Sequence, residues 1–138
     1  MVSLSLDIVY YSNRSGNTRR FVEKLGYKDT IDLSSNPDLV VHSKYVLFVP
    51  TYGGGHGEYS IPRPVANFLN DKMNRQQLVG VVGFGNTNFG DHYCKAAYLI
   101  AEKTGVPILA KIELLGTPED VQLVQERLRK LNEQLQLS

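Results

Sequence analysis

A run of small polar residues follows the first apolar segment of the chain and could bind a phosphate group. It offers hydroxyl and amide groups, together with backbone N–H groups at the start of a predicted helix, and these donors suit an anion. Gly16 permits close approach or an unusual φ angle, and Arg14 could add positive charge. An ordinary strand-to-helix turn is the alternative, since the run is neither a G-x-G-x-x-G nor a Walker A sequence. The candidate phosphate-binding residues are Ser12, Asn13, Arg14, Ser15, Gly16, Asn17 and Thr18.

A glycine-rich loop follows a second apolar run, Tyr45–Pro50. Glycines let backbone amides and carbonyls reach a planar ligand, and they let the loop change conformation cheaply. We expect the small residues of this loop to control what reaches a bound ring. A mobile surface loop without a ligand is the alternative. The candidate ring-lining residues are Thr51, Tyr52, Gly53, Gly54 and Gly55.

A third polar loop, Gly85–Gly90, follows the apolar run Leu78–Phe84. Asparagine side chains both donate and accept hydrogen bonds, which suits the edge of a ring that bears N–H and C=O groups. Phe89 could stack on the face of such a ring. The alternative is a turn with two asparagines and one packing phenylalanine. The candidate residues in this loop are Asn86, Asn88, Phe89 and Gly90.

The sequence contains no recognisable acid, base or nucleophile beside these loops. His56 has no second His or Cys at the spacing of metal ligands, so no metal site is predicted. Cys94 fits a buried, inert thiol better than a reactive one. A binding site without catalytic side chains suits a protein whose cofactor carries the chemistry.

Apolar runs and helical periodicities alternate along the chain, which predicts a parallel sheet covered by helices on both faces. The three polar loops would follow the first, third and fourth strands, and ligands bind at the carboxyl ends of strands in such sheets. The expected fold is a doubly wound α/β sheet of five parallel strands in the order 2-1-3-4-5, with helices on both faces. Strands are expected at 4–10, 30–33, 45–51, 78–84 and 107–115, and helices at about 17–25, 62–70, 91–104 and from 118.

The composition fits one soluble domain spanning residues 1–138. The formal net charge is +1 and no basic block stands out, so nothing supports nucleic-acid binding. The apolar stretches are too short to cross a membrane, and the N-terminus does not resemble a signal peptide. A single cysteine cannot form an internal disulfide, which favours a cytoplasmic protein.

The combination of these loops resembles the flavodoxins, and more closely the NrdI family, the small flavodoxin-like partners of class Ib ribonucleotide reductase. The Asn-x-Asn-Phe-Gly and Glu-Leu-x-Gly-Thr segments are more specific than the phosphate loop. The chain departs from the family at Gly83 and Phe84, where Ser and Ala are more frequent before the Gly-Asn pair. The matching segments are Tyr11–Thr18 with Arg20 and Phe21, Pro50–Gly55, Pro62-Arg63-x-Val65, Phe68–Asn70, Gly85-Asn86-x-Asn88-Phe89-Gly90 and Glu113-Leu114-x-Gly116-Thr117.

The resemblance implies a flavin mononucleotide (FMN) cofactor whose reduced form reacts with molecular oxygen. The superoxide formed would reach the dimanganese form of the reductase's small subunit and generate its manganese–tyrosyl radical cofactor. An unidentified flavin reductase would supply the electrons. Two alternatives stay open: a short-chain flavodoxin that serves as a general electron carrier, and a flavodoxin-like domain without a cofactor. A charge near neutral fits a dedicated partner better than the strongly acidic character of ordinary flavodoxins.

Overall fold

Short runs of β-branched and aromatic residues form a parallel sheet of five strands in the order β2-β1-β3-β4-β5, which confirms the predicted fold class. The computed structural model describes residues 6–51, 61–86 and 94–137. The central strand β3 is buried along its whole length because helices cover both of its faces. The strands are β1 (Asp7–Tyr10), β2 (Thr30–Asp32), β3 (Tyr45–Pro50), β4 (Leu78–Gly85) and β5 (Ile108–Glu113).

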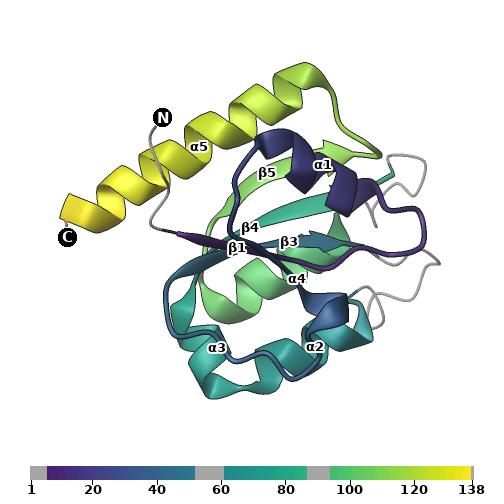
Figure 1. The fold of residues 1–138 in the computed structure, drawn as a ribbon. Helices are drawn as coiled ribbons and strands as arrows, with labels where there is room; N and C mark the ends of the chain where they lie inside the picture. Colours follow the sequence, from purple (N-terminus) through teal and green to yellow (C-terminus); the bar gives the residue numbers. More distant parts are fainter. Residues whose placement is uncertain (1–5, 52–60, 87–93, 138) are drawn as a thin grey trace.

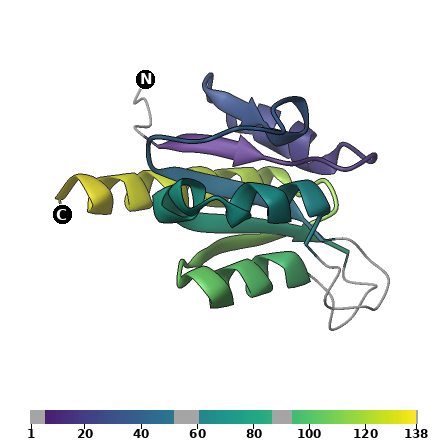
Figure 2. The same cartoon turned by 90° about the horizontal axis from the view of Figure 1, so that it is seen from below.

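Helices lie on both faces of the sheet (Figure 1), and the view in Figure 2 shows the same layers from below. α1 (Asn17–Leu25) and α5 (Pro118–Leu137) cover one face, while α2 (Arg63–Asn70), α3 (Lys72–Gln77) and α4 (Lys95–Thr104) cover the other. The alternation of side chains along β3 serves both layers. Phe48 packs with the first pair of helices, and Leu47 packs with the second group.

Several predicted boundaries differ from the observed ones. α4 begins at Lys95, after Cys94 in a left-handed conformation, and not near residue 91. β5 is shorter at both ends than the predicted range, and β2 ends at Asp32, whose side chain caps the 3-10 helix η1 (Leu33–Ser35). The start of α5 follows the prediction, because Thr117 and Asp120 each accept a hydrogen bond from the other's backbone N–H.

The short helix α3 was not predicted, and it holds the connection between β2 and β3 in place. Asp71 caps α3 by accepting hydrogen bonds from the backbone N–H groups of Met73 and Asn74. The buried Asn74 amide accepts from the backbone N–H of Val41 at 2.8 Å and donates to the carbonyl of Leu39 at 3.0 Å. One side chain therefore satisfies the backbone of a connection that has no α-helix of its own.

Among the described residues, no helix combines the length and the apolar composition that a membrane span requires.

Candidate cofactor-binding site

A pocket of about 250 Å³ lies at the carboxyl ends of the strands, where the polar loops were expected to meet. Predicted and unpredicted residues both contribute to it. Of the candidates named from the sequence, the pocket brings together Asn13, Ser15, Asn17, Thr18, Thr51 and Asn86. The remaining lining residues, which the sequence did not single out as contacts, are Pro50, Phe84, Gly85 and Leu114.

The loop between β1 and α1 is held by its own side chains. Asn13 Oδ1 accepts hydrogen bonds from Ser15 Oγ at 2.6 Å and from the Ser15 backbone N–H at 3.2 Å. The Gly16 N–H donates to the Asn13 carbonyl at 3.0 Å, and Gly16 has φ +72°, which a residue with a Cβ adopts only with strain. The loop therefore turns tightly into α1 and places the start of this helix, with Asn17 and Thr18, at the pocket.

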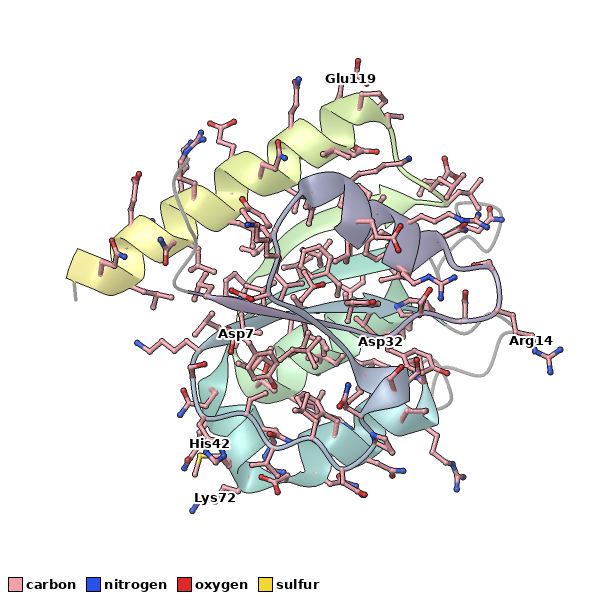
Figure 3. The ribbon with its side chains drawn as sticks, viewed as in Figure 1. Asp7, Arg14, Asp32, His42, Lys72 and Glu119 are labelled. Atoms are coloured by element: carbon pink, nitrogen blue, oxygen red, sulfur yellow. The ribbon has the colours of Figure 1, made fainter. Side chains whose placement is uncertain are left out.

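Three of the candidates in this loop do not line the pocket. Ser12 supports the loop, since its Oγ accepts a hydrogen bond from the backbone N–H of Arg19 at 3.3 Å. Gly16 provides the turn. Arg14 is exposed, and its side chain extends away from the body of the protein (Figure 3). Ser12 and Gly16 therefore shape the site, and contact between Arg14 and a ligand stays a prediction.

The Thr18 hydroxyl shows that this pocket suits a hydrogen-bond acceptor. Thr18 is only 1% exposed, and no described residue forms a hydrogen bond with its Oγ1. Every fully enclosed side-chain oxygen or nitrogen of the described residues has a hydrogen-bond partner. Because the Thr18 hydroxyl has none, it is not fully enclosed, and it opens into the pocket that Thr18 lines. A hydroxyl that faces a pocket and has no protein partner is free to donate a hydrogen bond to a ligand there. A phosphate ester has such acceptors, so the residues present fit FMN.

Thr51 lines the pocket and also connects the end of β3 to β4 and to α4. Its backbone N–H donates to the carbonyl of Phe84 at 3.0 Å and so extends the pairing of β3 with β4. Its Oγ1 accepts a hydrogen bond from the backbone N–H of Ala96 at 3.1 Å, in the first turn of α4. The side chain, predicted to line a ring, therefore also caps a helix.

Aromatic packing and a strained residue form the remaining wall. Phe84 is 3% exposed, and its ring packs edge-on against Phe21 of α1 with the centroids 5.2 Å apart. Leu114 has φ +53°, a rare conformation for a side chain of this kind, and is 49% exposed. Its backbone N–H donates to the carbonyl of Gly85 at 2.9 Å, which fixes it beside the end of β4. The sequence placed Leu114 inside the predicted strand 107–115 and in the family-like segment Glu113-Leu114-x-Gly116-Thr117, but it did not single Leu114 out as a site residue.

The other candidates, Tyr52, Gly53, Gly54, Gly55, Asn88, Phe89 and Gly90, lie outside the described residues. Within the described ranges, no group of three or more His, Cys, Asp or Glu side chains gathers as metal ligands would. Cys94 is fully buried, as expected for an inert thiol.

Known proteins with similar sequences and folds place this geometry in a family. Residues 9–126 match the family described as NrdI flavodoxin-like. Proteins named NrdI from Brucella ovis and Brucella melitensis are each 51% identical to the chain over 115 residues, which cover 83% of this chain and 85% of theirs. A flavodoxin from the domain Archaea shares the fold with a TM-score of 0.67 at 18% identity, covering 94% of this chain and 98% of its own. A short-chain flavodoxin associated with a non-canonical PDU bacterial microcompartment gives a TM-score of 0.64 at 17% identity, covering 97% of this chain and 99% of its own. The chain belongs to the NrdI family of flavodoxin-like flavoproteins.

Proposed function

We propose that the protein binds FMN and, when that flavin is reduced, supplies superoxide for assembling the dimanganese–tyrosyl radical cofactor of a class Ib ribonucleotide reductase. Family membership over most of the chain supports the flavin. The observation that carries the binding site is the hydroxyl of Thr18, a residue that is only 1% exposed: it has no protein partner among the described residues and opens into the pocket. The reductase partner rests on the family alone.

The residues around the pocket have distinct roles in this proposal. Ser15, Asn17 and Thr18 would hold the phosphate, because they line the pocket at the start of α1, where partial positive charge favours an anion. Thr51 and Asn86 would meet the rest of the flavin at the ends of β3 and β4. When bound and reduced, FMN would supply one electron to O₂ and so produce superoxide. The protein's own contribution is to retain and orient the flavin.

The alternative of a general electron carrier shares this cofactor and this fold. The net charge of +1 favours the dedicated role, since a carrier that serves many partners commonly relies on a strong surface charge to steer them together. We expect the small subunit of the reductase to be the partner, an unidentified flavin reductase to supply electrons, and the cytoplasm to be the site of action.

A radical-assembly assay separates the two functions. The FMN-loaded protein is reduced with dithionite without oxygen, freed of excess reductant and mixed with a manganese(II)-loaded class Ib small subunit. Oxygen is then admitted, and the tyrosyl radical is measured by electron paramagnetic resonance. We expect a radical signal well above that from the flavin-free protein treated in the same way.

Two controls sharpen the result. Free reduced FMN without the protein shows how much radical arises from oxidant made in solution. Superoxide dismutase added before oxygen tests the oxidant, and a lower radical yield supports superoxide. A yield no greater than that of the flavin-free control would instead favour the electron carrier.

A further inference from the structure

The first turn of α1 carries positive charge where a helix ordinarily favours negative charge. The turn contains no acidic residue, and it includes Arg19 and Arg20. The two guanidinium groups lie near Gly16, the N-cap residue. A Cβ built on Gly16 would lie 3.5 Å from an Nη atom of Arg19 and 3.9 Å from Cζ of Arg20. Two cations therefore converge on the positive end of a helix dipole.

No described carboxylate forms an ion pair with either arginine. The only ion pair among the described residues joins Lys130 and Glu126, far along α5. The charge of Arg19 and that of the acidic Asp32 both act on Tyr10. The pKa of Tyr10 is raised mainly by burial and then by Asp32, and the positive charge of Arg19 opposes that rise. In the absence of a ligand, the arrangement is electrostatically unfavourable, because like charges and the helix dipole oppose each other.

The pocket beside this turn independently indicates an anionic ligand. Thr18 lies between Gly16 and the two arginines in sequence, and its hydroxyl opens into the pocket and has no acceptor among the described residues. Ser15 and Asn17, the chain neighbours of Gly16, also line the pocket. An anion bound there would lie well within the distance over which charges interact at ordinary ionic strength, about 10 Å.

We propose that Arg19 and Arg20 determine the charge requirement of the phosphate subsite. They neutralise a phosphate monoester dianion, so FMN is retained in preference to riboflavin, and its affinity depends on ionic strength. This inference rests on the proposed binding of FMN and adds two specificity-determining residues outside the pocket lining. Their action is through space, so it requires charge and no particular hydrogen bond.

Binding measurements on charge-neutralised variants test the proposal. R19Q, R20Q and the double variant are titrated with FMN and with riboflavin by calorimetry. Each titration is run at low salt and at about 0.5 M salt, which screens the charges. K24Q is the matched control, because Lys24 is an exposed cation in the last turn of the same helix. Each single change is expected to weaken FMN binding about two- to fivefold at low salt, and the double change about tenfold.

Three comparisons decide the outcome. The loss of FMN affinity in the arginine variants should shrink at high salt. Riboflavin affinity should not change in these variants, and FMN affinity should not change in K24Q. The ligand-free double variant should melt at the same temperature as the unmodified chain or higher, since two repelling charges have been removed. An FMN affinity that matches K24Q, an equal loss for riboflavin, or a lower melting temperature without ligand would overturn the role of the arginines. A chain that fails to bind FMN before any substitution would instead overturn the proposed function.

Discussion

The side chain of Thr51, at the end of β3, caps α4 through a hydrogen bond from the backbone N–H of Ala96 at 3.1 Å. Cys94, the N-cap residue of α4 by position, makes no side-chain cap of its own and has φ +54°. Thr51, which lies 45 positions before Ala96 in the chain, thus replaces the local cap. Thr51 at the end of β3 lines the pocket, so this bond ties one wall of the pocket to α4.

Replacing Thr51 with valine should destabilise the ligand-free protein by about 1–2 kcal/mol, because the N–H of Ala96 loses its acceptor while the side-chain shape is kept. Thr51→Ser keeps the hydroxyl and should cost less than half as much. Urea denaturation of both variants measures the difference. Equal losses would show that the methyl group of Thr51, and not its hydroxyl, matters.

Replacing Thr18 with valine should weaken FMN binding by about tenfold or more, since a hydrogen bond to a charged phosphate contributes about 1.5–3 kcal/mol. Stability without ligand should stay the same or rise, because the hydroxyl has no protein partner among the described residues that the change would remove. Calorimetric titration with FMN and riboflavin provides the measurement. Riboflavin lacks the phosphate, so its affinity should not change; a parallel loss for both flavins would contradict the assignment.

Replacing Gly83 with alanine should destabilise the protein by about 1–3 kcal/mol through overpacking. The added Cβ would lie 2.5 Å from Cβ of Ala97, an atom that moves only if α4 moves. Gly80→Ala is the matched control on the same strand, since its Cβ would lie 3.2 Å from Cδ1 of Leu109, the end of a flexible side chain. The melting temperature of Gly80→Ala should be well above that of Gly83→Ala. The reverse order would show that close packing against α4 does not determine the cost of the added methyl group.

Alkaline pH should destabilise the protein partly through Tyr45. Burial raises the pKa of this phenol above its ordinary value of 10.0, and its hydroxyl donates to the carbonyl of Asn74 at 2.6 Å. Because the folded-state pKa is the higher one, the contribution is complete below pH 10 and is lost as the pH rises above it. The Tyr45→Phe variant should be about 1 kcal/mol less stable at neutral pH.

The test is the urea midpoint of both proteins, measured from about pH 7 to about pH 11 in steps of about one pH unit. The stability advantage of the unmodified protein should narrow above pH 10. Tyr10 and Tyr27 also have a pKa raised by burial, but both proteins contain them, so the difference between the curves isolates Tyr45. Parallel curves would contradict the prediction.

Replacing Leu114 with asparagine should raise the stability of the ligand-free protein by up to about 1 kcal/mol, because asparagine tolerates the left-handed conformation that costs leucine energy. Little burial is lost, since Leu114 is 49% exposed. FMN binding should weaken, because an apolar wall of the pocket is removed. Leu115→Asn is the control, as Leu115 is 39% exposed and is not among the residues with positive φ. If Leu114→Asn lowers the stability of the ligand-free protein while Leu115→Asn does not, the left-handed conformation of Leu114 is not a source of strain.

The sequence alone was sufficient for the sheet order and for most element positions. Helix α1 begins at Asn17 and ends at Leu25, as predicted, because its apolar spacing and flanking glycines are local signals. The buried strand at Tyr45–Pro50 was equally clear from its continuous apolar run. The helix α3 was missed, although Asp71 could have been recognised as its cap.

The composition of the site depended on the tertiary structure. Leu114 follows β5, which pairs with β4 only after the sheet forms, so the sequence could not bring it to a pocket with Thr18. The capping of α4 by Thr51 and the convergence of Arg19 and Arg20 on Gly16 likewise depend on distances between folded elements. Periodicity and turn chemistry are properties of neighbouring residues, so the sequence determines which elements form and where their polar loops lie. Contacts between side chains from distant segments are set by packing, and only the folded chain determines them.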